Sequence, residues 1–189
     1  MNKWKVAFFT LAGAIVFAVI LVIYLATSPA DDVAIPEPQK ITGNVLVVET
    51  TTKEFESIAK QYLSDALNMA KLPVEIKVND QIQLSSELIA FNVTVPIVMD
   101  FEPIVSNGNI RLKQTAVNVG KLNIPPTTVL KLMKDSIELP SWMMVRPNEE
   151  EIYVDLSRIN IASGSRVRAK EIDLKNDKIL LEIIIPAKR

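Results

Sequence analysis

The sequence predicts an α+β fold, in which an N-terminal transmembrane helix is followed by a long curved antiparallel sheet packed on one long and one shorter helix. Three observations support this prediction. Residues 6–26 are an apolar run without a charged residue. A helical repeat of apolar residues covers residues 52–70, and from residue 74 onward apolar and polar residues alternate with the period typical of strands. Helical and strand-rich segments in separate blocks are typical of α+β proteins.

The apolar run has the length of a membrane span. As a helix, residues 6–26 measure roughly 31 Å, which is close to the thickness of a bilayer core. Lys3 and Lys5 precede the run, and basic flanks remain in the cytoplasm, so we expect the N-terminus inside and the rest of the chain outside. The alternative is a cleaved signal peptide, but its apolar core usually has only about 7–15 residues. We therefore expect a retained, single-pass anchor in the cell membrane.

The expected organisation has four parts. Residues 1–5 are cytoplasmic, residues 6–26 cross the membrane, residues 27–43 form a linker, and residues 44–189 form one extracytoplasmic α+β domain. Three prolines and two adjacent aspartates keep the linker extended and solvated.

Composition excludes several classes of function. The chain has 21 Lys and Arg against 22 Asp and Glu, a balance that argues against a nucleic-acid partner. It has no cysteine, so no disulfide can form. It also has no histidine, which excludes Ser-His-Asp and Cys-His catalysis and the zinc sites that require imidazole or thiolate. We expect no cofactor, no metal site and no enzymatic activity.

The clearest helix outside the membrane is predicted over residues 52–70. Thr51 and Glu54 have the spacing of a capping box, in which each side chain accepts a hydrogen bond from a free amide at the helix start. Pro73 prevents the helix from continuing. The apolar stripe of the helix consists of Phe55, Ile58, Ala59, Tyr62, Leu63, Ala66, Leu67 and Ala70.

The clearest strand is predicted between Phe91 and Phe101, where every odd position is apolar. Eleven extended residues span about 36 Å, nearly twice the usual strand length. Pro96 indicates a bulge or an edge position, because proline cannot donate a ladder hydrogen bond. The alternation slips near residues 114–115, which predicts a second bulge.

A shorter second helix is predicted to begin at Pro126 and to end before Pro140, with Val129, Leu130 and Met133 on one face. The remaining alternating segments bring the expected total to six to eight strands in one meandering sheet. Turn signals lie at residues 79–80, 106–109 and 175–177.

Motifs that could carry chemistry are incomplete. Ser57 and Lys60 fit the Ser-x-x-Lys pattern of penicillin-recognising enzymes, but the partner motifs of those enzymes are absent and both residues fall on the polar side of the first helix. The acidic run at residues 148–151 lacks the spaced ligands of a calcium loop. A solvated surface explains both.

Large apolar side chains outside the anchor are unusually frequent. They could form an ordinary core. Alternatively, they could line an apolar groove, between the sheet and the long helix, in which an acyl chain binds. The candidate lipid-binding residues for the groove are Phe55, Ile58, Tyr62, Met69, Phe91, Phe101, Met133 and Trp142.

Four segments carry a family resemblance. GNIRLKQTAVNVGKLNIPPTTVLKLM, LPSWMMV, EEIYVDLS and IDLKNDKILLEIIIP together resemble the YpmS-like family of Gram-positive bacteria. The resemblance implies a membrane-anchored external protein, often encoded beside a GDSL-type lipase or esterase, with no catalytic residue assigned. Residues 117–130 are also similar to passages in small envelope proteins whose tubular folds wrap a curved sheet around a long helix and house lipid. Similarity of fold does not fix function.

Three hypotheses follow. The first is a non-enzymatic protein of the cell envelope that binds the acyl chain of a lipid or of a lipid-linked envelope component. The second is an accessory or scaffold subunit for an envelope enzyme such as a GDSL-type lipase. The third, which we rank last, is a hydrolase that uses a Ser-Lys or carboxylate pair. The expected partners are the membrane, a lipid ligand or an envelope lipase or esterase.

Overall fold

The computed structural model describes residues 3–27, 34–36, 42–67, 74–90, 93–120, 122, 124–136, 139–159, 161 and 164–186. The chain divides into two compact units, residues 1–31 and residues 32–189. The first unit contains helix α1 (Lys3–Thr27), whose segment Lys3–Leu21 is long and apolar enough to cross a membrane. An N-terminal apolar helix is therefore confirmed.

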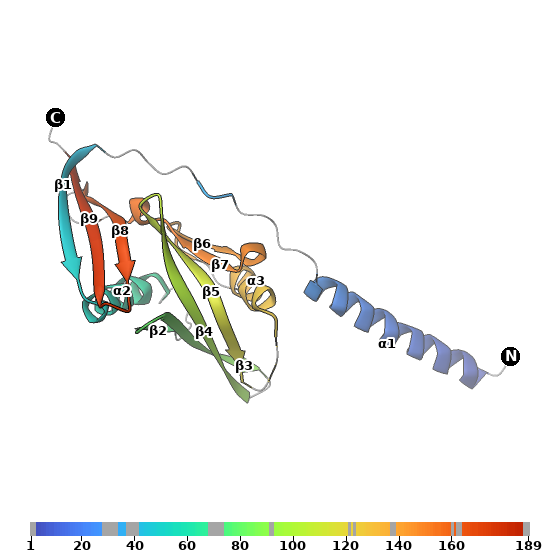
Figure 1. Ribbon diagram of the computed structural model, residues 1–189. Coiled ribbons are helices and arrows are strands. Elements are labelled where there is room, and N and C mark those ends of the chain that lie inside the picture. The colour runs from blue at the N-terminus through green and yellow to red at the C-terminus, as the bar shows by residue number, and fades with distance from the viewer. Residues whose placement is uncertain are drawn as a thin grey trace. The chain divides into compact units, whose positions relative to one another are not determined.

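The second unit contains a three-stranded antiparallel sheet in the order β1-β9-β8 (Figure 1). Its strands are β1 (Gly43–Thr50), β8 (Arg166–Asp173) and β9 (Lys178–Pro186). β1 pairs with β9 along its whole length, from Gly43 opposite Pro186 to Thr50 opposite Ile179. The predicted turn at residues 175–177 joins β8 to β9 and is confirmed.

A six-stranded antiparallel sheet has the order β2-β3-β4-β5-β7-β6. A turn at Asn107 and Gly108 joins its two longest strands; both residues have positive φ angles, 53° and 82°, as a two-residue hairpin with the native twist requires. The predicted hairpin turn is confirmed. The strands are β2 (Val74–Val78), β3 (Ile82–Ala90), β4 (Val93–Ser106), β5 (Asn109–Val119), β6 (Met143–Arg146) and β7 (Glu151–Val154).

The pairing of β4 with β5 contains the bulge that the sequence predicts. Asp100 lies opposite Ala116 and Phe101 lies opposite Gln114, so Thr115 has no residue opposite it. The extra residue restores the inward direction of the apolar side chains on both sides of the bulge.

Pro96 lies in β4 at the end of the ladder that this strand forms with β5. It is opposite Glu87 of β3, whereas the ladder with β5 begins one residue later, at Ile97. The carbonyl oxygen of Pro96 accepts a hydrogen bond from the amide of Gly120 at 3.0 Å, just beyond the end of β5. The expectation of a bulge or an edge position at Pro96 is therefore wrong, because β4 lies between β3 and β5 and its ladder with β3 continues through Pro96 without a register shift. Proline is tolerated there because its ring nitrogen lies at the end of the β4–β5 ladder.

Helix α2 (Thr52–Leu67) begins with the predicted capping box. The amide of Glu54 donates to Oγ1 of Thr51 at 3.2 Å, and the amide of Thr51 donates to Oε2 of Glu54 at 3.4 Å. Residues 68–70, which the sequence assigns to the same helix, lie outside the described residues.

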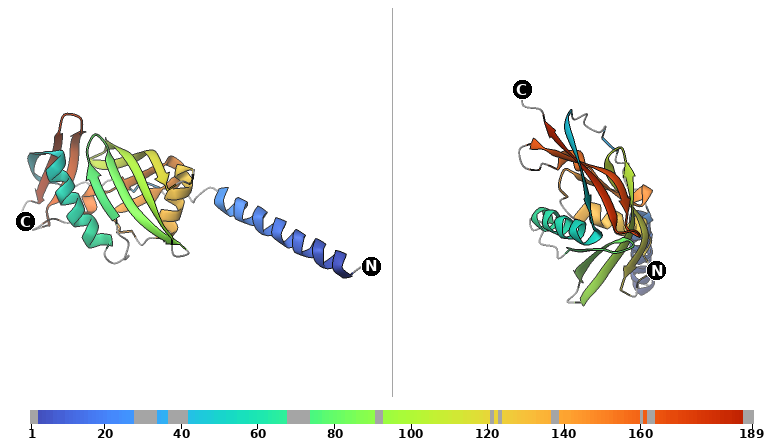
Figure 2. Two further views of the ribbon diagram at one scale, coloured as in Figure 1. Left: turned by 90° about the horizontal axis from the view of Figure 1, so that it is seen from below. Right: turned by 60° about the vertical axis from the view of Figure 1, so that its left-hand side comes forward.

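Helix α3 (Pro126–Ser136) begins at the predicted proline. It packs on the six-stranded sheet at β5 and β6, whereas α2 lies beside β2, and the two views of Figure 2 show the helices in different parts of the unit. Two 3₁₀ turns, η2 (Pro147–Glu149) and η3 (Leu156–Arg158), flank β7.

The α+β class and the two helices of unequal length, 16 and 11 residues, are confirmed. The expectation of one sheet of six to eight strands is wrong, because the described residues form two sheets of three and six strands. The reason is physical: alternation shows which face of a strand is buried, but it does not show which strand is its neighbour.

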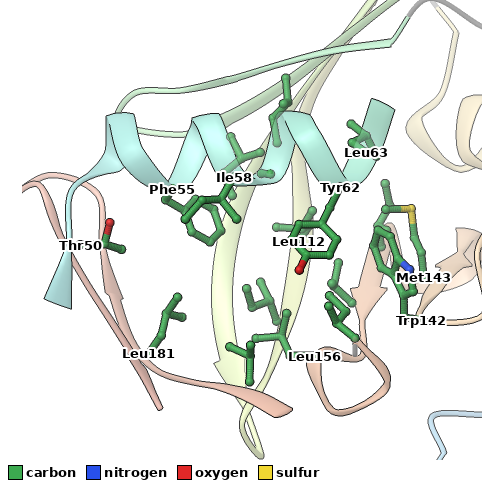
Figure 3. A pocket seen from close by; sticks show the side chains of 18 of the residues that line it. Thr50, Phe55, Ile58, Tyr62, Leu63, Leu112, Trp142, Met143, Leu156 and Leu181 are labelled. Carbon is green, nitrogen blue, oxygen red and sulfur yellow. The ribbon is translucent and has the colours of Figure 1, made fainter. Parts of the chain in front are cut away.

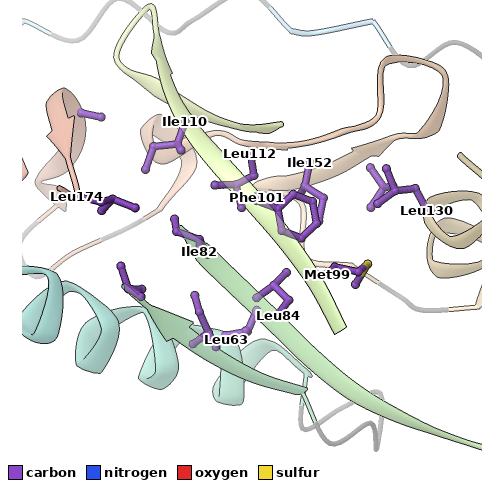
Figure 4. Close-up of a cluster of buried hydrophobic side chains, with 14 of the residues drawn as sticks. Leu63, Ile82, Leu84, Met99, Phe101, Ile110, Leu112, Leu130, Ile152 and Leu174 are labelled. Carbon is purple, nitrogen blue, oxygen red and sulfur yellow. The ribbon is translucent and has the colours of Figure 1, made fainter. Parts of the chain in front are cut away.

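The core lies on the inner face of the six-stranded sheet. Figure 4 shows Phe101 and Ile152 of that sheet near Leu130 of α3, and each of the three is 0% exposed. Glu151 is also 0% exposed, and its two oxygens are paired separately with Arg111 and Arg146. Such double pairing compensates for the loss of water around a buried carboxylate.

Candidate functional site

An apolar cavity of about 340 Å³ lies between α2, the three-stranded sheet and the six-stranded sheet (Figure 3). Its position follows from the split of the strands into two sheets, because α2 covers the space between them. Functional pockets in proteins have volumes of about 300–1,000 Å³.

Helix α2 forms one side of the cavity. Phe55, Ile58, Ala59, Tyr62 and Leu63 of its apolar stripe line the space. Leu63 is buried, whereas Ile58 keeps 50% of its surface exposed. Most of the stripe therefore faces the cavity and is not fully packed against other side chains.

The N-terminal half of α2 is attached to both sheets by polar contacts. The amide and Oγ1 of Thr52 donate to Oδ1 of Asp177, in the β8–β9 turn, at 2.7 and 2.6 Å. The amide of Val78, at the end of β2, donates to Oε2 of Glu56 at 2.7 Å. These hydrogen bonds hold the helix across the gap between the sheets.

The carboxylates at this end of α2 have lowered pKa values. Hydrogen bonds from the side chain and amide of Thr52 lower the pKa of Asp177 from its ordinary 3.8. The side-chain hydrogen bond from Thr50, followed by the amide of Thr51, lowers the pKa of Glu54 from 4.5. Both groups therefore remain ionised at neutral pH, where they accept the hydrogen bonds that attach and cap α2.

The six-stranded sheet forms the buried floor of the cavity. All six floor residues are buried, with at most 7% of their surface exposed, so this side is closed to solvent. They are Ile76, Ile82, Leu84, Ile110, Leu112 and Ile152.

Two further walls are partly exposed. β1, β8 and β9 contribute one wall, with Val48, Val167, Leu181 and Ile183. The opposite wall is contributed mainly by Trp142, Met143, Val154, Leu156, Ile159 and Ile161, of which Leu156 is buried and the others are partly exposed.

Among the described residues, three lining side chains contain a nitrogen or oxygen atom, and no charged side chain lines the cavity. Oγ1 of Thr50 donates to Oε2 of Glu54 at 3.0 Å, so it is already engaged. The other two are Tyr62 and Trp142. Within the described ranges, Asp and Glu side chains also form no cluster of three that could hold a metal ion. The arrangement can exclude water from an apolar group and offer it few hydrogen bonds.

The structure brings four of the eight sequence-predicted site residues together. Phe55, Ile58 and Tyr62 of α2 and Trp142 opposite them all line the cavity. Phe101 lies in the core with 0% exposure, and Met133 of α3 packs against the same core. Met69 and Phe91 lie outside the described residues.

Sequence reasoning did not select most of the residues that form the floor and the β-sheet walls. The alternating pattern marks Ile82, Leu112 and Leu181 as inward-facing, and that signal is present in the sequence. The same pattern is produced by a strand that faces a filled core. Only the packing of the two sheets shows that these side chains face a cavity.

Comparison with known proteins identifies the family of the chain. Residues 2–185 match the family model described as "Uncharacterized protein conserved in bacteria (DUF2140)". The chain belongs to the DUF2140 family. It is 31% identical, over 181 residues and 95% of each chain, to the "Uncharacterized protein YpmS" of Bacillus subtilis (strain 168), which confirms the YpmS-like resemblance. No solved structure matches the chain.

Proposed function

We propose that this member of the DUF2140 family is a membrane-anchored extracytoplasmic protein that binds the acyl chain of a lipid or of a lipid-linked envelope component without acting on it chemically. The observation that carries the proposal is the apolar cavity of about 340 Å³ between α2 and the two sheets.

The lining favours a hydrocarbon over water. A buried water molecule usually makes about three hydrogen bonds. Among the described residues, the lining side chains offer a water molecule only Tyr62 and Trp142 as partners, since the hydroxyl of Thr50 is bound to Glu54. Hydrocarbon needs no such partners, and it removes the aliphatic walls from water.

The N-terminal helix supplies the proposed location. Lys3 and Lys5 precede its apolar segment, and Asp31 and Asp32 follow it. This distribution of charge favours a cytoplasmic N-terminus and an external second unit. A covalent linker then keeps the cavity within reach of membrane lipids.

The proposal is tested with the full chain in nanodiscs that contain a lipid with a photoreactive diazirine in its acyl chain. Illumination is expected to produce lipid-modified peptides from α2 and β9, in addition to those from α1. Labelling confined to residues 3–27 would contradict acyl-chain binding by the cavity.

Two variants sharpen this experiment. Ala59→Phe places a ring in the cavity and is expected to reduce labelling of β9 several-fold. Ser57→Phe adds the same ring to an exposed position of α2 and is expected to leave the labelling unchanged. Equal labelling in both variants would place the bound chain outside the cavity.

A second candidate function is that of an accessory subunit for an envelope enzyme, and strand β1 favours it. β1 is an edge strand of its sheet. Its residues Val45, Leu46 and Val47 are 54%, 54% and 49% exposed, so apolar side chains are exposed on both faces of the strand. Exposed apolar edges are suited to pairing with another chain.

This candidate is tested by placing a photoreactive amino acid at Leu46 in cells. A specific cross-link to an envelope lipase or esterase, lost when Val45 and Val47 are replaced by lysine, would support a scaffold role. Capture of no envelope enzyme would remove this candidate and leave the lipid proposal intact.

A further inference from the structure

The hydroxyl of Tyr62 is an unusual feature of the cavity. The ring extends from α2 toward Leu156, into the space between the helix and the sheets (Figure 3). In the described part of the chain the hydroxyl has no hydrogen-bond partner. Tyr62 is partly exposed, and its hydroxyl points into a space lined by apolar side chains, so an acceptor atom of a ligand in the cavity can take the hydrogen bond.

The ligand group that meets Tyr62 must be an acceptor without charge. Among the described residues, no arginine or lysine lines the cavity. Transfer of an ionised carboxylate into such surroundings is strongly unfavourable unless a cation pairs with it. A carbonyl of an ester or amide accepts a hydrogen bond from the hydroxyl without this cost.

The volume of the cavity limits the number of acyl chains that it can hold. An apolar cavity of about 150 Å³ holds one benzene molecule. The cavity of about 340 Å³ is slightly more than twice as large. By that proportion it has room for roughly a dozen carbon atoms. This is one acyl chain of moderate length and is too small for the two chains of a diacyl lipid.

We infer that the cavity selects a single acyl chain in ester or amide linkage, and that the hydroxyl of Tyr62 donates a hydrogen bond to the carbonyl of that linkage. The inference rests on the proposed function, because it assigns the ligand class of the same cavity. The headgroup beyond the carbonyl then lies outside the apolar lining.

The test uses the full chain in an amphipathic polymer and four probes: dodecane, methyl dodecanoate, dodecanoate at pH 8 and didodecanoyl phosphatidylcholine. The displacement of a fluorescent acyl probe gives each affinity. We expect methyl dodecanoate to bind tightest, and dodecanoate and the two-chain lipid to bind at least tenfold more weakly.

Tyr62→Phe separates the hydrogen bond from the shape of the cavity. The loss of one hydrogen bond is expected to weaken the binding of methyl dodecanoate by about 3- to 10-fold. The affinity for dodecane should not change. The infrared stretch of a ¹³C-labelled ester carbonyl should move to higher frequency, a change that a purely structural role of Tyr62 would not produce. Tyr24→Phe, in α1, is the control and should alter neither measurement.

The outcomes are distinguishable. If neither dodecane nor methyl dodecanoate binds, the proposed function itself fails. If both bind but Tyr62→Phe leaves the ester affinity and its carbonyl stretch unchanged, the inference is overturned while acyl-chain binding stands. Equal affinity for the ester and for dodecanoate or the two-chain lipid would likewise overturn it.

Discussion

Helices α2 and α3 have similar sequence patterns but different surroundings. Both carry an apolar stripe with helical spacing. On α3 the stripe is closed against the six-stranded sheet, where Val129 and Leu130 are 5% and 0% exposed. On α2 only Leu63 of the cavity-lining residues is buried, and its neighbours Phe55, Ile58 and Tyr62 line the cavity.

The difference comes from what each helix faces. α3 packs directly on one sheet, at β5 and β6. α2 is attached to β2 through Glu56 and to the turn of the other sheet through Asp177, so it lies across two supports. Because α2 is attached to two separate sheets, a space remains between the helix and the sheets. α3 packs on one sheet, and its apolar side chains fill the space against that sheet. The comparison shows that an amphipathic stripe identifies a buried face but does not identify what the face contacts.

The largest expected effect tests this difference directly. Leu130→Ala should destabilise the second unit by about 2–5 kcal/mol, because it leaves a void in a closed core. Ile58→Ala on α2 should cost less than about 1 kcal/mol, because Ile58 is half-exposed and loses few contacts. Urea unfolding of the full chain measures both. Equal losses would show that α2 is packed as tightly as α3.

Enlarged side chains provide the converse test. Ala169→Phe, at a core position with 5% exposure, should destabilise by about 1–3 kcal/mol through overpacking. Ala59→Phe should be near neutral, since its ring enters the cavity. Thermal unfolding compares the two variants. A strong loss of stability in Ala59→Phe would contradict the presence of space beneath α2.

A smaller effect is expected in the six-stranded sheet, at Gln114 of β5. The side-chain amide of Gln114 is buried, and in the described part of the structure neither its nitrogen nor its oxygen has a hydrogen-bond partner. Gln114→Met keeps the shape and removes the unsatisfied groups, so it should stabilise by about 1 kcal/mol. Urea unfolding measures the gain, and a loss of stability would indicate that the amide is satisfied in solution.

The smallest expected effect is the loss of α2 stability at acidic pH. The pKa values of Asp177 and Glu54 are lowered in the folded chain by hydrogen bonds from Thr52, Thr50 and Thr51. Their stabilisation is therefore fully present above the ordinary values of 3.8 and 4.5, and it is lost as the pH falls through the lowered folded values. Amide-exchange protection of α2 should fall with acid at a higher pH than protection of α3.

Asp177→Asn is the matched control for this prediction. Asp177 has a φ angle of 52°, a left-handed conformation that asparagine tolerates. The variant retains an acceptor for Thr52 but cannot be protonated in this range, so the acid sensitivity of α2 should decrease. Unchanged acid sensitivity would show that Asp177 does not control the attachment of α2.

Several local features could be predicted because neighbouring residues determine them. The capping box at Thr51 and Glu54, the turn at Asn107 and Gly108, and the bulge near Thr115 depend on residues only a few positions apart. The candidate site could be predicted only in part. The shared helix face predicts Phe55, Ile58 and Tyr62, which line the cavity, whereas Phe101 has the same apolar character and lies in a closed core.

The sequence by itself determined the apolar N-terminal helix, the identity of most helices and strands, the turns between them and the family resemblance. Only the tertiary structure decided that β1, the first strand in the sequence, pairs with β9, the last, that the strands divide into two sheets, and that α2 covers a cavity between them. The physical reason is that the period of apolar residues records which side of each segment avoids water. The neighbour of each strand depends on contacts between segments far apart in the chain, which no local pattern records.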